Sequence, residues 1–316
     1  MPILTTTDFL LLQPSLINEG KVLVKTLSVE EKSTFYQELL KADTIEIVSD
    51  YFPFLTVKNN LPLVSFHTNH DNSKQLKDVT YINKPNKLLK YFPAIFRNHI
   101  KLFKYGNKVF IGGINLGEDS NRSIDFMIQV PDAVATYLSG NITNYWYGKD
   151  LNNCQRRIVI EDSVLLLDRP RIFENSAIMK EACKIVSEAK SEVYLTSQFL
   201  PSGSLLKAII NASNSGVKVN ILLPPEDYYL LTKFPYNINY FISKRKLKGL
   251  KNVTIKHSTQ IVHGKVIVTD SNLLIGSHNY LGLTNIFGIV ELNLAIKNKV
   301  IVDDARNKIS KYFQNE

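Results

Sequence analysis

The 316-residue sequence has few cysteines and no long apolar run, and each absence excludes a class of protein. Cys154 and Cys183 are the only cysteines, and no close Cys or His spacing suggests a zinc site. Structural disulfides are therefore not expected, and a reducing compartment is favoured over secretion. Because no run of about 18 apolar residues occurs, the sequence predicts no transmembrane helix. The first residues lack a basic leader and a small-residue cleavage site, so we expect no signal peptide.

Negative charge is also scarce, since 38 Lys and Arg outnumber 29 Asp and Glu and give a formal net charge of +9. This balance favours an anionic partner, such as phospholipid head groups, nucleic acid or a phosphorylated small molecule. A solvated lysine-rich surface fits the composition equally well. The densest basic cluster, residues 244–251, ends a helix predicted at about 238–248, where cations suit the helix dipole. We expect a cytoplasmic protein, with peripheral membrane binding as an option.

Several landmarks occur twice in the same order, which predicts a duplicated unit. An apolar strand ending in an aromatic residue and a proline covers residues 45–53 and again 193–201. Each copy precedes a hairpin that opens with a histidine, and each half then closes with a strand and a helix. We expect an amphipathic helix before each landmark strand, at residues 29–41 and 176–189.

The repeat predicts a first half over residues 1–160 and a second half over residues 161–316. The second half shows a strand–helix–strand pattern from Val193 to Leu223, which predicts a parallel strand pair. The first half is expected to be shortened. Its landmark proline lies 46 residues before the histidine (Pro53 to His99), whereas the second-half interval is 62 (Pro201 to His263).

Both hairpins carry the same polar residues at the same spacing. Lys101 and Lys265 each follow a histidine, His99 or His263, by two positions. Residues i and i+2 of a strand face the same side, so each His/Lys pair should project together. An asparagine follows each histidine by 16 positions and should return on the adjacent strand; these are Asn115 and Asn279. The sequence predicts two histidines, two lysines and two asparagines around one cavity.

Such a set suits phosphodiester chemistry. Lysine ammonium and asparagine amide groups can bind the phosphate oxygens. One imidazole can attack phosphorus, while the other protonates the leaving alkoxide and then activates water or an alcohol. A carboxylate should hold the other nitrogen of the imidazole, and Asp125 and Glu291 stand at matching places for that role. Gly113 and Ser277 are candidate substrate-binding residues, and Asp270 a supporting one. No cofactor is predicted, and no metal.

These motifs resemble the phospholipase D superfamily, whose signature is His-x-Lys, a following Asp, and Gly-Ser or Gly-Gly before x-Asn. The resemblance extends from about Thr44 to the end of the chain. It implies an α/β fold of two duplicated sandwich halves, each a mixed sheet flanked by helices, related by a pseudo-twofold axis. It also implies a metal-independent reaction through phosphohistidine, with His99 as nucleophile and His263 as acid and base. Residues 112–118 and 196–202 are most similar to bacterial cardiolipin synthases and related phosphatidyltransferases.

One residue departs from this family pattern. Gly106 stands where the first motif usually has an aspartate, so we expect a less rigid first hairpin that remains active.

Three functions stay open on the sequence alone. The first is a phosphatidyltransferase or phospholipase acting on phospholipid at an anionic membrane surface. The second is a nuclease or phosphodiesterase that acts on nucleic acid, and the third is a non-catalytic phosphate-binding scaffold. An apolar tunnel at the histidines would favour lipid, and an open basic groove nucleic acid. No obligate protein partner is predicted.

Overall fold

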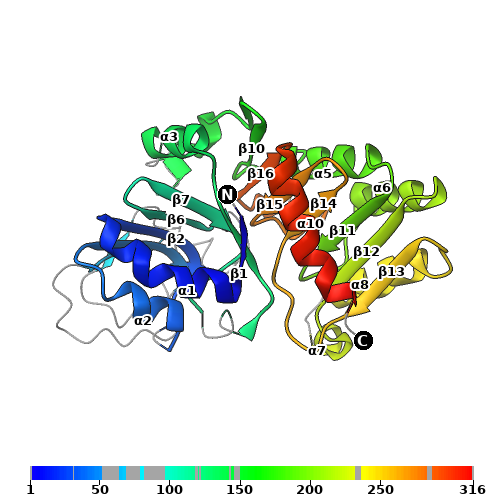
Figure 1. The fold of residues 1–316 in the computed structure, drawn as a ribbon, viewed down its shortest axis with the longest axis horizontal. Coiled ribbons are helices and arrows are strands. Elements are labelled where there is room, and N and C mark those ends of the chain that lie inside the picture. Colours follow the sequence, from blue (N-terminus) through cyan, green and yellow to red (C-terminus); the bar gives the residue numbers. More distant parts are fainter. Residues whose placement is uncertain are drawn as a thin grey trace.

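Two eight-stranded mixed sheets form the framework of the described part of the chain (Figure 1). The computed structural model describes residues 2–30, 32–51, 64–68, 79–81, 97–117, 120, 122–141, 144–145, 150–231, 236–282 and 287–314. The first sheet has the order β1-β8-β7-β6-β2-β3-β4-β5, with β1 (Ile3–Thr5), β2 (Val22–Ser28), β3 (Ile45–Tyr51), β4 (Val64–Thr68), β5 (Val79–Tyr81), β6 (Leu102–Tyr105), β7 (Lys108–Gly112) and β8 (Phe126–Gln129). The second has the order β13-β12-β11-β14-β15-β16-β10-β9, with β9 (Arg157–Ile160), β10 (Ser163–Asp168), β11 (Glu192–Thr196), β12 (Lys218–Leu223), β13 (Val253–His257), β14 (Val266–Thr269), β15 (Leu273–Gly276) and β16 (Glu291–Ile296).

Helices cover both sheets, and the buried apolar residues of the described part of the chain form three cores. The longer ones are α1 (Thr6–Leu16), α2 (Thr34–Leu39), α3 (Asp132–Gly140), α5 (Ala177–Ser187), α6 (Gly203–Asn214), α7 (Glu226–Leu231), α8 (Tyr236–Leu247) and α10 (Lys299–Gln314). Buried residues of α1 and α2 pack on the first sheet, and those of α5, α6 and α8 on the second. A third core lies between the sheets and includes α3, α10 and strands of both halves. The two lobes and the helix α10 between them are visible in Figure 1.

The sequence pattern explains where some of these helices begin. Ser176 accepts a hydrogen bond from the backbone N–H of Met179 at 2.8 Å and so caps α5. Buried Ile178, Ala182 and Ile185 recur at intervals of three or four residues and give α5 one apolar face. The predicted helix over 176–189 is therefore confirmed, as is the parallel pairing of β11 with β12.

The predicted match between the two landmark strands is wrong. Read in opposite directions, the two sheet orders superimpose β1 on β10, β6 on β14, β2 on β11 and β3 on β12. The strand equivalent to β11 is therefore β2, which the sequence reading assigned no role, and β3 corresponds to β12. The helix expected over 29–41 is shorter, because β2 runs to Ser28 and α2 begins only at Thr34.

The predicted division of the chain into a shortened first half and a second half stays a prediction. With the corrected match, the end of β3 at Tyr51 lies 48 residues before His99, and the end of β12 at Leu223 lies 40 residues before His263. Strand β9 pairs with β10 of the second sheet, so we propose a boundary between α3 and β9.

Gly106 forms the turn between β6 and β7, and its contacts explain why no aspartate stands there. Its φ is +53°, and a Cβ at this position would lie 2.6 Å from the carbonyl oxygen of Glu19. Its N–H donates to the carbonyl of Lys21, just before β2. In the second half, Asp270 forms the equivalent link by accepting hydrogen bonds from Lys190 and Ser191, just before β11. A backbone contact thus joins the first hairpin where a carboxylate joins the second.

Gly106→Ala is expected to lower the free energy of unfolding by about 2–4 kcal/mol, because the methyl group adds a clash to an unfavourable φ. Gly203→Ala is the matched control, since Gly203 has a φ of +63° and no neighbour within 4 Å of an added Cβ. It should lose only about 1–2 kcal/mol. Urea unfolding of both variants measures the difference, and equal losses would contradict a role for the Glu19 contact.

Candidate active site

Backbone hydrogen bonds between the halves hold both histidines. The N–H of His99 donates to the carbonyl of Val290 at 2.8 Å, and the N–H of His263 donates to the carbonyl of Ile124 at 2.9 Å. Bridges between Asn98 and Val290 and between Ile124 and Val262 repeat the arrangement on each side. The residues that follow Ile124 and Val290 are Asp125 and Glu291. Each half therefore brings a carboxylate to the histidine of the other half.

The histidine–carboxylate pairs are accordingly crossed. Nδ1 of His99 lies 2.9 and 3.0 Å from the two carboxylate oxygens of Glu291, and Nδ1 of His263 lies 2.7 Å from Oδ2 of Asp125. Both carboxylates are buried, with side chains at most 1% exposed. A carboxylate at Nδ1 fixes the ring tautomer and leaves Nε2 for a substrate. The structure brings Asp125 and Glu291 to the place required for the predicted orienting role.

Gly113 and Ser277 occupy equivalent positions behind these carboxylates. A Cβ on Gly113 would lie 2.1 Å from Oδ1 of Asp125, so only glycine lets that carboxylate approach. Ser277 is fully buried, and its hydroxyl donates to Glu291 and accepts from the N–H of Leu292. The N–H of Gly113 is bonded to the carbonyl of Phe126. We propose that both residues act by positioning Asp125 and Glu291, and the substrate-binding role predicted for them stays a prediction.

The two predicted lysines are buried beside the histidines. Lys101 Nζ donates to the carbonyl of His99 at 2.9 Å, and Lys265 Nζ donates to the carbonyl of His263. Burial lowers the pKa of Lys265 to about 8, although Asp125 and Glu291 oppose the shift. Burial and the charge of Lys265 lower the pKa of Lys101 well below its ordinary value.

A third buried lysine was missed by the sequence reading. Lys25 on β2 is fully buried, and its Nζ donates to the carbonyl of Asn98 at 3.1 Å, next to His99. Its charge lowers the pKa of Lys101, so it contributes to the positive potential of the site. A lysine inside a buried strand has no signature in the spacing of the motif.

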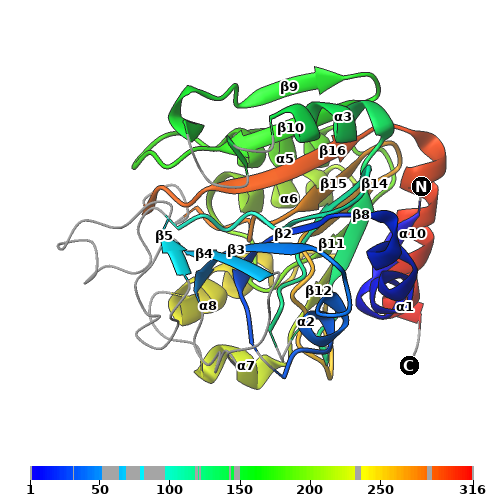
Figure 2. The same ribbon diagram turned by 90° about the vertical axis from the view of Figure 1, so that its left-hand side faces the viewer.

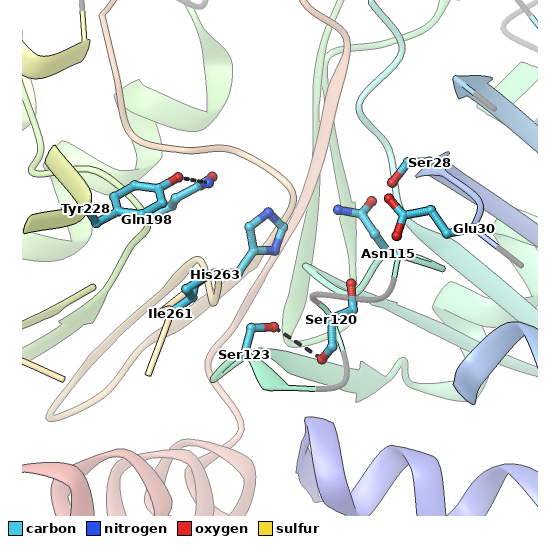
Figure 3. Close-up of a pocket in the computed structure, with 10 residues that line it drawn as sticks. Ser28, Glu30, Asn115, Ser120, Ser123, Gln198, Tyr228, Ile261 and His263 are labelled. Atoms are coloured by element: carbon cyan, nitrogen blue, oxygen red, sulfur yellow. Dashed lines mark hydrogen bonds between the residues drawn. The ribbon is translucent and has the colours of Figure 1, made fainter. Parts of the chain in front are cut away.

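The two asparagines are held differently. Oδ1 of Asn115 accepts from the hydroxyl of Thr26 and the N–H of Leu27, each at 3.3 Å, so its amide nitrogen faces His263 (Figure 3). This orientation presents a hydrogen-bond donor to a phosphate oxygen. Oδ1 of Asn279 has no hydrogen-bond partner within the described part of the chain. Asn293, also missed from sequence, accepts from the N–H groups of Ser277 and His278 and fixes the turn after β15.

The two carboxylates differ in their electrostatics. Burial raises the pKa of Glu291 to about 8, against the opposing effects of Lys101 and Ser277. Burial also tends to raise the pKa of Asp125, but the contacts with His263 and Lys265 outweigh it and lower that pKa. Burial lowers the pKa of His263 to about 4 and that of His99 well below its ordinary value. The two carboxylates of the site thus differ in the direction of their pKa shifts, although each is paired with a histidine.

Asp270, the last of the predicted site residues, and His278, which stands between Ser277 and Asn279, lie outside this cluster. Asp270 is at the turn after β14, at the other end of that strand from His263, and its hydrogen bonds to Lys190 and Ser191 fit a supporting role. His278, between motif residues, is fully buried and accepts from the N–H of Tyr280. The described residues contain no group of three or more His, Cys, Asp or Glu side chains that could hold a metal ion.

A cavity of about 200 Å³ opens beside His263 (Figure 3). Its walls are mainly polar and come from both halves: Ser28, Glu30, Asn115, Gly117, Ser120, Ser123, Gln198, Tyr228, Ile261 and His263. Gln198 donates to the hydroxyl of Tyr228 at 2.7 Å, which steadies one wall. The cavity has the character of neither an apolar tunnel nor a basic groove. At roughly 30 Å³ per water molecule, it has room for about seven water-sized groups.

Residues 182–315 match a family described as "Cardiolipin synthase, PLD-like domain". These residues, most of the second half, are therefore similar to a phospholipase D-like domain. It is 25% identical over 235 residues to cardiolipin synthase of Clostridium perfringens (strain SM101 / Type A), covering 65% of this chain and 47% of that protein. Cardiolipin synthase A of Buchnera aphidicola subsp. Schizaphis graminum (strain Sg) is 30% identical over 129 residues, covering 40% of this chain and 26% of that protein. The chain thus spans about half, or less, of the length of these relatives.

Solved structures of similar fold cover both halves of the chain. Phosphatidylserine synthase of Haemophilus influenzae Rd KW20 has a TM-score of 0.69 at 10% identity, covering 98% of this chain and 85% of that one. Yeast tyrosyl-DNA phosphodiesterase has a TM-score of 0.56 at 11% identity, covering 94% and 89%. At such identities the likeness concerns the fold, and the predicted fold class of two α/β halves is confirmed.

Sulfate should bind between the buried lysines of the phospholipase D-like site and weaken as pH rises through about 8. Below that pH Lys265 is charged, and above it the ammonium loses its proton, while sulfate stays a dianion. Lys265→Arg should keep binding to higher pH, because a guanidinium stays protonated. Isothermal titration calorimetry across this range tests both statements. Wild-type binding that does not change with pH would contradict the assigned role of Lys265.

Proposed function

We propose that the protein transfers a phosphatidyl group from a phospholipid to an alcohol or to water through a phosphohistidine. The observation that carries this proposal is the crossed pair of histidines, each held at Nδ1 by a buried carboxylate of the other half. Lys101 and Lys265 lie on either side, and Asn115 directs an amide nitrogen toward His263. The cardiolipin synthase relatives supply the lipid substrate class.

The reaction proceeds in two displacements. Nε2 of His99 attacks phosphorus, the bond from phosphorus to the leaving alcohol oxygen breaks, and His263 gives that oxygen a proton. In the second step His263 takes a proton from the incoming alcohol or water, whose oxygen attacks phosphorus as the nitrogen–phosphorus bond breaks. Lys101, Lys265 and Asn115 bind the phosphate oxygens and stabilise the charge that develops on them.

The cavity beside His263 supports a polar alcohol on that side of phosphorus. In an in-line displacement the leaving group departs opposite the nucleophile, so with His99 attacking, the alcohol lies at His263. Hydroxyls of Ser28, Ser120 and Tyr228 line this space and can hydrogen-bond a head group. Glu30 also lines it, and among the described residues that line it there is no lysine or arginine.

The nucleic-acid alternative is less well supported. A polynucleotide would place its next phosphate close to the first. Among the described residues that line the cavity, Glu30 is acidic and none is a lysine or arginine, so the negative charge of that second phosphate has no positive partner there. The net charge of +9 remains the observation in favour of a nuclease. The scaffold alternative does not account for two intact His/Lys pairs with a carboxylate on each histidine.

Product analysis tests the proposed reaction. Wild type, His263→Ala and the control His257→Gln, which lies outside the site, are incubated with phosphatidylglycerol vesicles and with single- and double-stranded DNA in chelator. We expect cardiolipin or phosphatidic acid from wild type and the control, and at least about 10²-fold less from His263→Ala. Loss of DNA cleavage in that variant would instead establish a nuclease, and no turnover would favour a scaffold.

The covalent intermediate can be tested by acid-free denaturation and mass spectrometry. Wild type quenched during turnover should carry a phosphatidyl group on His99, because both displacements pass through this intermediate. His99→Ala should carry no label. A group found on His263 in this variant would reverse the two assigned roles.

The pH profile of kcat/KM should rise toward pH 8. Glu291 has a pKa of about 8, so below pH 8 its carboxyl group is protonated and cannot accept a hydrogen bond from the Nδ1–H of His99. Nε2 of His99 is then not held in the unprotonated form that can attack phosphorus. Above pH 8 the carboxylate fixes the reactive tautomer. Glu291→Gln should be about 10²–10⁴-fold slower and should lose this rise. An unchanged rise in the variant would assign the titration to another group.

A further inference from the structure

Helix α8 presents an unusual outer face to solvent. Ile238, Phe241 and Ile242 are 47%, 49% and 51% exposed, and their spacing of three and four residues aligns them in one stripe. Arg245, and Lys248 just past the end of α8, continue the same stripe and are also exposed. The stripe is therefore apolar over about one turn and basic beyond it. We call these five residues the α8 stripe.

The opposite face anchors the helix firmly in the second half. Tyr240, Ser243 and Leu247 are buried at helical spacing. The ring of Tyr240 stacks on Tyr229 of α7 with centroids 3.9 Å apart, and the side-chain amide of Asn239 donates to the carbonyl of Leu200 at 3.0 Å. The exposure of the stripe is thus a property of an ordered helix.

Helix α8, which carries the stripe, packs against α7, which contributes to a wall of the cavity at His263. α7 and α8 are neighbours at one end of the second half (Figures 1 and 2). Tyr228, next to the stacked Tyr229, lines that cavity and accepts the hydrogen bond from Gln198. A surface that bound the α8 stripe would therefore lie alongside the helix that borders the cavity.

The charges select the kind of surface. Lys244 is engaged by Glu226, but the exposed Arg245, Lys246 and Lys248 carry positive charge at the end of the apolar segment. Apolar side chains flanked by basic ones match the acyl boundary and the anionic head groups of a bilayer. A polynucleotide would match the charges but leave the apolar part in water.

We propose that the α8 stripe docks the protein on an anionic phospholipid bilayer. This inference rests on the proposed function for the identity of the substrate, and it names the surface that brings the enzyme to it. Docking requires no turnover, so it can be measured separately from the reaction.

Vesicle co-sedimentation of the whole protein tests the docking. Wild type should bind phosphatidylcholine vesicles that contain phosphatidylglycerol, and the double variant Phe241→Ser/Ile242→Ser should bind them at least about tenfold more weakly. Val300→Ser is the matched control, because Val300 is 76% exposed on another helix and should not affect binding. Arg245→Gln/Lys248→Gln should weaken binding to these vesicles several-fold and make the remaining binding less dependent on salt.

Each outcome decides the proposal. Equal binding by wild type and the serine double variant, or no binding by wild type, would overturn it. Retention on single-stranded DNA that is lost in the charge variant, with vesicle binding absent, would identify the stripe as a nucleic-acid contact. Vesicle binding by wild type without any lipid turnover would leave the docking standing and reject the proposed reaction.

Discussion

The backbone bridges between the halves are the constraint on which the site depends. Burying the carboxylates of Asp125 and Glu291 is unfavourable unless each is paired, and the partner of each is a histidine from the opposite half. The hydrogen bonds from His99 to Val290 and from His263 to Ile124 set the register that makes both pairs possible. Fold, electrostatics and proposed chemistry therefore share one origin, which is the docking of two similar sheets across a common core.

Equivalent positions of the two halves do not make the same contacts. On one side a short Asp125 packs against Gly113, and on the other a longer Glu291 receives the hydroxyl of Ser277. The pKa of Glu291 is raised to about 8 while that of Asp125 is lowered, so the two carboxylates titrate in different pH ranges. This difference between equivalent positions is compatible with different proposed roles for the two histidines.

The sequence predicted the paired motifs and the fold class because these follow from local regularities: the two-residue period of a strand and the length of a hairpin. It did not predict which carboxylate meets which histidine, because that depends on how distant segments dock. Strand β2 escaped notice since Lys25, a buried lysine, interrupts its apolar pattern, and β3 was matched to β11 in its place. Gly113 and Ser277 were read as substrate contacts because spacing does not show that Asp125 and Glu291 occupy the space beside them.

The shared core has a consequence for dividing the chain. A fragment limited to residues 182–315 would contain His263, Lys265 and Glu291 but would lack β9, β10 and Asp125. It would expose the apolar surface that now faces the first sheet, and its histidine would lose the carboxylate that orients it. The smallest active unit is therefore both halves together. Complementation between separately produced halves would have to rebuild the two backbone bridges before either histidine could function.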